Sequence, residues 1–354
     1  MGDSIAHEHD DRQTDDDEPA STREMHTDES KCADAAPTVA GGRGQAARPP
    51  LIIHFHIPKN GGVTISRLFK MKLGFWPPSH LLHHSTVLGF YSIHLSERIP
   101  KIQSLSERAK RRIRFVEGHA GFGLHEFLPQ PSTYITMLRD PIDRAVSSYF
   151  YQRQEGHIPQ DVSFEQWIAR DDPTRIWFSD NPQVRYLAGE KGRIVDVPHG
   201  TCTEAMLELA KQRLHDHFAL VGILEQFDAS MILLRRLMGW RSCYYGRSNV
   251  TRQRKRVSEV PDATLGLIRE HNELDLELYR FAKTRFQERI DAEGPSFQAE
   301  LRQFQVRMED VGGRLSRLYR ILGIGRPLRR RLARTTEQIR HPKRRLDEFD
   351  EPQP

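Results

Sequence analysis

The chain has 354 residues, a net charge of +5, an apolar fraction of 37% and a mean hydropathy of −0.63. This length allows one large domain or two ordinary ones. No run reaches the roughly 18 consecutive apolar residues of a membrane-spanning helix, and the acidic N-terminus lacks the apolar core of a secretion signal. We therefore expect neither a membrane anchor nor a secretion signal.

The charges and the apolar residues divide the chain into three predicted parts. Residues 1–30 hold 11 acidic and 2 basic side chains, and residues 1–50 show no periodic apolar pattern, so we expect residues 1–50 to be disordered. A folded domain is predicted over residues 51–293, beginning just after Pro49-Pro50. A basic, partly helical extension is predicted over residues 294–354.

The first folded segment combines a strand, a glycine turn and a helix. Leu51–Phe55 is an apolar run typical of a buried strand, and apolar residues with helical spacing follow over Val63–Leu73. Gly61 and Gly62 let the backbone approach an oxyanion closely, and the new helix offers unpaired N–H groups at its positive dipole end. This arrangement predicts a site for a phosphate or sulfate ester.

Two side chains strengthen this anion site. Lys59 supplies a mobile positive charge, and Thr64 supplies a hydroxyl donor. The turn is not a Walker loop, in which the lysine follows the glycines. An ordinary strand-to-helix turn with an exposed lysine is the alternative interpretation of this segment taken alone.

Two further strands are predicted before residue 140. Ile113–Val116 is followed by Glu117 and His119 at its end, and Tyr134–Leu138 is followed by Arg139. Polar residues at the carboxyl ends of strands are typical of ligand sites in open α/β sheets.

Arg139 precedes a predicted helix that Asp140 caps, with proline in its first turn. A planar guanidinium at this position, with Ser147 on the following helix, suits bidentate capture of a second phosphate. The alternative is a salt bridge between Arg139 and either Asp140 or Asp143.

The remaining predicted elements follow in chain order. We expect short helices within 163–173 and over Asn181–Gly189, a helix over Thr203–His215, a strand over Phe218–Ile223, and helices over Leu224–Trp240 and His271–Ile290. Arg185, in the second of these helices, has two interpretations: it faces a bound ligand, or it forms a surface salt bridge.

Beyond these helices, residues 314–345 hold 12 Lys/Arg and one Glu. Contact with an anionic membrane surface, an acidic polysaccharide or the acidic N-terminus stays open for this segment, beside a solvated extension.

The chain contains three cysteines, Cys32, Cys202 and Cys243, and no CxxC pair. A disulfide between Cys202 and Cys243 is neither required nor excluded. A reducing compartment is the simpler interpretation, so we expect a cytoplasmic protein.

Two anion sites in one sheet suggest a nucleotide with phosphates at two separate positions. HIPKNGGVTI (56–65) resembles the 5′-phosphosulfate loop, and LRDPIDRAVSSYFY (138–151) the 3′-phosphate element, of carbohydrate sulfotransferases of the heparan-sulfate 2-O/6-O type and their bacterial relatives. The resemblance covers about Leu51–Ile290. It implies 3′-phosphoadenosine 5′-phosphosulfate as the sulfate donor and a carbohydrate as the acceptor.

The resemblance also assigns donor-binding residues: Lys59, Asn60, Gly61, Gly62, Val63 and Thr64 in the first loop, and Arg139, Ser147 and Arg252 around the 3′-phosphate. Asn60 and Val63 replace hydroxyl residues of the family loop, although the Asn60 amide remains a donor. For Arg252, a solvated basic run over Arg252–Arg256 is the alternative.

The resemblance further implies that His119 takes the proton from the acceptor hydroxyl. A neutral imidazole with a pKa near 6.5 can do so at physiological pH. Glu117 is the second candidate, either as the base or as a residue that orients His119. His125 is a third candidate, with a surface or structural role as the alternative interpretation. His54 and His56 are expected to be mainly structural.

Lys59 is expected to neutralise charge on the leaving oxygen during in-line sulfuryl transfer. No metal is chemically required, and His83-His84 lacks metal-ligand spacing.

We predict an α/β fold, P-loop-like and three-layered, with a central, mainly parallel sheet and helices on both faces.

The predicted function is sulfuryl transfer to a carbohydrate hydroxyl, with no nucleic-acid partner and an undetermined oligomeric state. The alternatives are an ATP-dependent kinase, a non-catalytic polyanion-binding protein, and a sulfotransferase acting on a lipid or on protein tyrosine.

Overall fold

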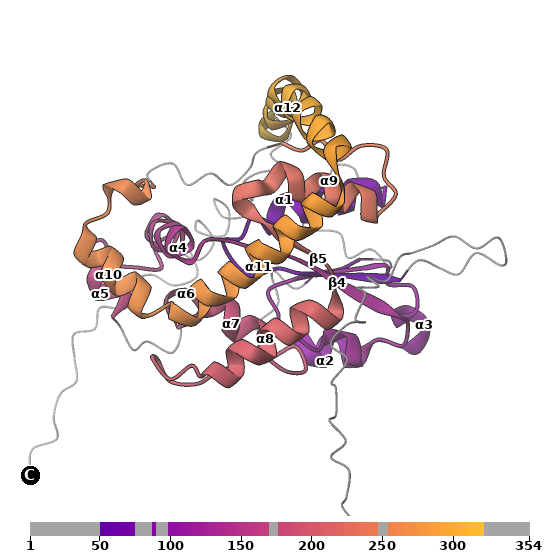
Figure 1. Cartoon of the computed structure of the whole chain (residues 1–354). Helices are drawn as coiled ribbons and strands as arrows, with labels where there is room; N and C mark the ends of the chain where they lie inside the picture. Colours follow the sequence, from indigo (N-terminus) through magenta and orange to yellow (C-terminus); the bar gives the residue numbers. More distant parts are fainter. Residues whose placement is uncertain (1–49, 75–86, 90–97, 170–175, 247–253, 322–354) are drawn as a thin grey trace, which may run out of the picture. The chain divides into compact units, whose positions relative to one another are not determined.

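The computed structural model describes residues 50–74, 87–89, 98–169, 176–246 and 254–321 (Figure 1). A single sheet with strand order β2-β3-β1-β4-β5 forms its centre, and every neighbouring pair is parallel. The strands are β1 (Leu51–Phe55), β2 (Val87–Gly89), β3 (Phe115–Gly118), β4 (Ser132–Leu138) and β5 (Phe218–Ile223). The predicted α/β class and parallel sheet are confirmed.

Helices cover both faces of this sheet. Figure 1 shows α1 and α9 on one side and α2 and α8 on the other. The helices that position the site and its supports are α1 (Gly62–Lys72), α4 (Pro141–Glu155), α7 (Pro182–Leu187), α8 (Glu204–His217), α9 (Phe227–Leu237), α11 (Glu273–Ala292) and α12 (Pro295–Ile321). Shorter or peripheral helices are α2 (Arg98–Gln103), α3 (Glu107–Lys110), α5 (Phe164–Ile168), α6 (Ile176–Ser179) and α10 (Asp262–Glu270).

The central strand β1 brings the predicted site residues to one edge of the sheet. All five of its residues are buried, as expected for a parallel strand covered on both faces. Phe55, its last residue, pairs with Gly118 of β3 and Thr136 of β4. The segments that follow β1, β3 and β4 therefore emerge side by side, as the strand-end argument predicts.

Strand β3 differs from its prediction at both ends. It begins at Phe115 and continues through Glu117 and Gly118, so Glu117 lies inside the strand. Glu117 can lie inside the strand because its charge is compensated: the residue is 1% exposed, and Nζ of Lys70 in α1 lies 2.5 Å from its Oε1. A carboxylate with a nearby ammonium partner can be accommodated in a buried strand.

Helices α7 and α11 are joined by buried polar contacts at their N-termini. Asp275, in the first turn of α11, accepts the backbone N–H groups of Gln183 (2.9 Å) and Val184 (2.7 Å). Asn181 precedes α7 in a left-handed conformation (φ 42°), and its Oδ1 accepts the N–H of Asp275 at 3.0 Å. Each helix start thus satisfies backbone groups of the other.

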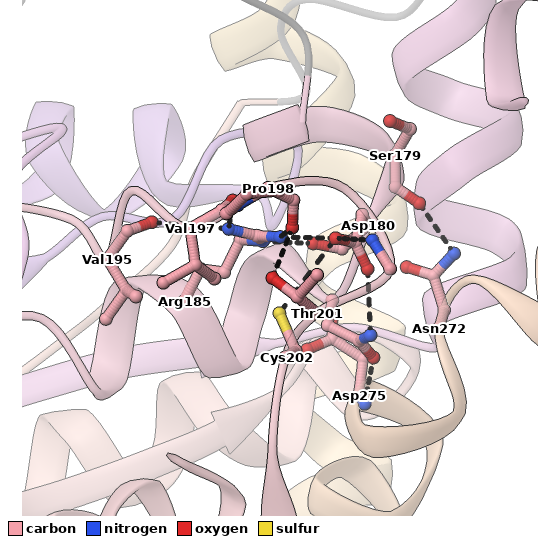
Figure 2. Close-up of polar contacts among 12 residues, drawn as sticks. Ser179, Asp180, Arg185, Val195, Val197, Pro198, Thr201, Cys202, Asn272 and Asp275 are labelled. Atoms are coloured by element: carbon pink, nitrogen blue, oxygen red, sulfur yellow. Dashed lines mark hydrogen bonds and ion pairs between the residues drawn. The ribbon is translucent and has the colours of Figure 1, made fainter. Parts of the chain in front are cut away.

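Arg185 forms a salt bridge, as one interpretation of the sequence predicts, but the pair with Asp180 is buried and does not lie on the surface. Its guanidinium pairs with Asp180 and donates to the carbonyls of Val197 (2.8 Å) and Pro198 (3.0 Å), as Figure 2 shows. The side chain is fully buried. It fixes the 195–198 segment against α7 and does not face a ligand.

Cys202 lies beside this group, with its Sγ 4.0 Å from Asp180 Oδ2, and both Cys202 and Cys243 are free thiols.

The C-terminal helices pack on the edge of the domain. Arg289 of α11 donates to the carbonyl of Ala219 in β5 at 2.8 Å. Arg236 of α9 forms ion pairs with Glu293 and Glu300, which hold the start of α12. Within the described residues, no helix is long and apolar enough to cross a membrane. The basic segment beyond Ile321 lies outside these residues.

Asp275 generates a stability prediction. Burial raises its pKa to about 6, against the opposing effect of Arg144 and of two backbone N–H groups. Asp275→Asn should lower the free energy of unfolding by about 1–3 kcal/mol at neutral pH, because an amide has one oxygen for the two backbone N–H donors and would turn its NH2 group toward the other. Urea unfolding of both proteins measures this difference.

The pH dependence of that difference provides the control. The folded-state pKa lies above the ordinary value of 3.8, so the folded protein holds this proton more tightly than the unfolded chain does. The advantage of the wild type over Asp275→Asn should therefore be largest below pH 4 and decline as the pH rises through about 6. A difference that grows across this window would contradict the assignment.

Candidate functional site

The loop after β1 requires its two glycines for different reasons. Gly61 has φ +76° and caps α1, a conformation that L-residues rarely adopt. At Gly62 an added Cβ would lie 2.1 Å from Cδ2 of His56, so the histidine ring occupies the space of a side chain. The packing of Leu224 and His56 against the loop therefore requires both glycines. The N–H groups in the first turn of α1 are those that a helix leaves without intrahelical partners, and such groups favour an oxyanion.

The Asn60 side chain, predicted to donate its amide hydrogens to a sulfate, points into the protein. Its Nδ2 donates to the carbonyl of Met137 (2.8 Å) and to Oε1 of Gln183 (2.9 Å), and its backbone N–H donates to Ile57 (3.3 Å). The residue is 1% exposed. Because both amide hydrogens are used within the protein, the side chain fixes the loop to β4 and α7, and the expected amide donation to a sulfate is not supported.

Lys59 lies in a left-handed conformation (φ 71°) and places its Nζ 3.7 Å from the ring centroid of Tyr151. Burial, followed by the positive charges of Arg139, Arg144 and Arg254, lowers its pKa to about 7. An incoming anion would reverse this effect by favouring the ammonium form. Lys59 is therefore positioned as a charge that an anionic ligand stabilises.

Arg139 connects the two predicted loops. Its Nη1 donates to the carbonyl of Lys59 at 2.7 Å, and its Nε and Nη2 donate to Oδ2 of Asp143 at 2.9 and 2.5 Å. The alternative interpretation, a salt bridge with Asp143, is thus present in the structure. The guanidinium still lies beside the Lys59 loop, which is the position that a phosphate-binding role requires.

Gln183 also joins the two loops, and the sequence analysis did not identify it. Its Oε1 accepts the backbone N–H of Arg139 (3.1 Å) besides the Asn60 amide, and its Nε2 donates to the Arg139 carbonyl (3.0 Å). The only sequence signal was that it belongs to the predicted helix over Asn181–Gly189. Membership of that helix does not show whether the Gln183 side chain points toward the two loops or toward solvent.

Helix α4 presents one polar face to this site. Asp143, Ser147 and Tyr151 are spaced four residues apart, so they lie along one side of the helix. Ser147 is 5% exposed and sits between the Arg139 partner Asp143 and the Lys59 partner Tyr151. Arg144, by contrast, turns inward and donates to the carbonyl of Phe178 at 3.3 Å.

Arg254 is a further cation of the site, although it belongs to the Arg252–Arg256 run, for which a solvated position was the alternative interpretation. Its guanidinium pairs with Oδ1 of Asp143, and burial with the neighbouring charge of Arg139 lowers its pKa to about 10. Arg252, the residue predicted in this role, lies outside the described residues. A basic run alone cannot show which member turns inward.

His119 lies on the other side of β1. Its Nδ1 is 3.0 Å from the carbonyl of His56, and the two rings are 4.6 Å apart between centroids. A carbonyl can only accept, so Nδ1 carries the hydrogen and the lone pair is on Nε2. Burial, above all, holds the pKa of His56 well below its ordinary value. This tautomer of His119 is the one a general base needs.

Two other predicted residues have structural contacts. Glu117 is committed to Lys70, so its described contact is with α1. Nδ1 of His125 lies 2.9 Å from the hydroxyl of Tyr134, in agreement with a structural role.

Among the described residues, a single acidic cluster has metal-like spacing: Glu204, Glu208 and Glu277. Lys211 pairs with Glu208 and Glu277 at 2.7 and 2.6 Å, which accounts for the cluster without an ion.

Comparison with known proteins agrees with the resemblance seen in the sequence. The model of the galactose-3-O-sulfotransferase family matches residues 90–314. The heparin sulfate O-sulfotransferase of Drosophila melanogaster is 22% identical over 263 residues, 67% of this chain and 72% of the relative. Human uronyl 2-sulfotransferase is 23% identical over 269 residues, 67% of this chain and 63% of the relative.

Galactose-3-O-sulfotransferase 2 of Sus scrofa is 29% identical over 141 residues, 37% of this chain and 34% of the relative. The chain thus spans only part of each of these proteins. Because the family model covers more than half of the chain, the chain belongs to the galactose-3-O-sulfotransferase family of carbohydrate sulfotransferases.

Proposed function

We propose that this protein transfers a sulfuryl group from 3′-phosphoadenosine 5′-phosphosulfate to a hydroxyl of a carbohydrate. The observation that carries this proposal is the direct connection of two anion loops, through the 2.7 Å bond from Arg139 to the Lys59 carbonyl and through Gln183. Two anion sites at a fixed separation suit a nucleotide with phosphates at both its 5′ and 3′ positions.

The donor would be held at two points. The N–H groups at the start of α1 and the Lys59 ammonium suit the 5′-phosphosulfate. Arg139, Arg254 and Ser147 suit the 3′-phosphate, since guanidinium groups bind phosphate in a bidentate manner. ATP carries no 3′-phosphate and would leave this second group of cations without a partner.

In the proposed reaction, the acceptor hydroxyl loses its proton to Nε2 of His119 as its oxygen forms a bond to sulfur. The bond between sulfur and the 5′-phosphate oxygen breaks, and the electron pair remains on the nucleotide. Lys59 and the N–H groups at the start of α1 stabilise the charge that develops there. The products are a sulfate ester and adenosine 3′,5′-bisphosphate.

A carbohydrate acceptor is supported by the relatives, whose names refer to heparin sulfate, uronyl and galactose groups. Transfer of labelled sulfate to galactose-containing and uronic-acid-containing glycans is the direct test of this proposal. If none of these glycans accepts sulfate although the donor binds, the acceptor is not a galactose-containing or uronic-acid-containing glycan, and the carbohydrate part of the proposal fails.

Replacing the proposed base should affect the rate and leave donor binding intact. His119→Ala should lower kcat by about 10²–10⁴, because a positioned histidine contributes this much to proton transfer. The dissociation constant of adenosine 3′,5′-bisphosphate should change little. His125→Ala is the matched control, since that ring contacts Tyr134; equal losses in both variants would contradict a catalytic role for His119.

Removing the Arg139 guanidinium should weaken nucleotide binding. Arg139→Ala is expected to cost about 1–3 kcal/mol in the binding free energy of adenosine 3′,5′-bisphosphate, the value of a lost charge-assisted hydrogen bond. Calorimetric titration measures it, with Arg302→Ala on the exposed surface of α12 as the control. An unchanged dissociation constant would place the 3′-phosphate elsewhere.

The depressed pKa of Lys59 predicts proton uptake on binding. With a pKa of about 7, the free lysine is largely neutral at pH 8, and a bound anion restores the ammonium form. Titration with the bisphosphate at pH 8, in buffers of different ionisation enthalpy, should therefore show uptake of part of a proton per site. Lys59→Arg, which stays charged, should abolish this uptake; the same uptake in both proteins would exclude Lys59 as its source.

A further inference from the structure

Two guanidinium groups converge on one carboxylate at the start of α4. Oδ2 of Asp143 accepts hydrogen bonds from Nε (2.9 Å) and Nη2 (2.5 Å) of Arg139, while its Oδ1 pairs with Arg254. The backbone N–H of Asp143 is capped separately by Asp140 at 2.9 Å. The carboxylate therefore occupies the position between the two arginines that an external anion would take.

The surrounding charges explain why the free protein needs an anion here. Arg139 is 6% exposed, and Lys59 lies close enough for its pKa to be lowered by Arg139 and Arg254. Partly buried cations that lack counter-charge repel one another at considerable cost. Glu225 and Asp140 also act as negative charges on Arg139. Asp143 is the carboxylate that contacts both Arg139 and Arg254.

The two ion pairs differ in ways that matter for exchange with a ligand. The Arg139 side chain is 7% exposed and keeps a second anchor, the Lys59 carbonyl, so it does not depend on Asp143 for its position. Asp143 and Arg254 are 29% and 26% exposed and face solvent. The carboxylate is thus the accessible member of a site whose deeper guanidinium is held independently.

We propose that Asp143 is an internal substitute for the 3′-phosphate, which occupies Arg139 and Arg254 in the free protein and yields them when a nucleotide binds. This inference rests on the proposed function. The carboxylate remains near the incoming phosphate, and repulsion between the like charges lowers nucleotide affinity. Asp143 thereby weakens the hold on the product, adenosine 3′,5′-bisphosphate, and favours its release.

The alternative is that Asp143 only orients Arg139 for phosphate binding. The two roles predict opposite signs for one substitution. If the carboxylate competes with phosphate, its neutralisation tightens binding; if it orients the guanidinium, its loss weakens binding.

Asp143→Asn separates these roles, since the amide is isosteric and still accepts a hydrogen bond through Oδ1. The dissociation constants of adenosine 3′,5′-bisphosphate and adenosine 5′-phosphate are measured by calorimetry in the full-length chain. The bisphosphate should bind about tenfold more tightly, whereas the 5′-phosphate should change less than about twofold. Asp310→Asn is the control: an exposed aspartate of α12, paired with Arg314, that loses the same charge.

Weaker binding of the bisphosphate to Asp143→Asn, or no change, would overturn the proposal. An equal gain for both nucleotides would also overturn it, because it would reflect net charge alone. If thermal unfolding shows that Asp143→Asn is not folded, Asp143→Ser provides a second neutral variant with a hydroxyl suited to a first helical turn.

The wild type separates this inference from the proposed function. If the wild type binds neither nucleotide, the proposed function fails together with the inference. If it binds the bisphosphate and Arg139→Ala weakens that binding, the donor site stands, and only the assigned role of Asp143 depends on the Asp143→Asn result.

Discussion

The relative position of the Lys59 loop and the segment that begins at Arg139 depends on the buried side-chain amide of Gln183. Its oxygen accepts from the Asn60 side chain and the Arg139 backbone, and its nitrogen donates to the Arg139 carbonyl. Only an amide side chain offers both a donor and an acceptor of this shape. Because the group is fully buried, the loss of any one partner would leave an unsatisfied polar atom, so the loops and α7 are held as one unit.

Gln183 is positioned in turn by a chain of polar contacts that begins in α11. Asp275 accepts the backbone N–H groups at the start of α7, and Asn181 completes the junction between the two helices. These contacts lie away from any ligand, yet they set the distance between the Lys59 loop and Arg139. A reaction that depends on electrostatic stabilisation requires such preorganisation, because charges that are already in place need not be reorganised during the reaction.

The concentration of positive charge is costly for the free protein and useful to the complex. Burial lowers the pKa values of Lys59, Arg139 and Arg254, and neighbouring positive charges lower those of Lys59 and Arg254 as well. An anionic nucleotide would relieve this repulsion, so part of the cost of building the site is recovered on binding. His119 is separated from these cations by the chain segment after β1, and its bond to the His56 carbonyl leaves the lone pair on Nε2, the form that accepts a proton.

The sequence by itself determined the strands β1 and β5, the capped start of α4, and the placement of Lys59, His119 and Arg139 at adjacent strand ends. These features follow from local patterns and from the geometry of a parallel sheet. The inward direction of Asn60, the burial of Arg185 and the roles of Gln183, Asp143 and Arg254 were decided only by the tertiary structure. A polar side chain has the same local pattern whether it faces solvent or a buried partner, and here one such partner, Gln183 for Asn60, lies 123 residues away in the chain.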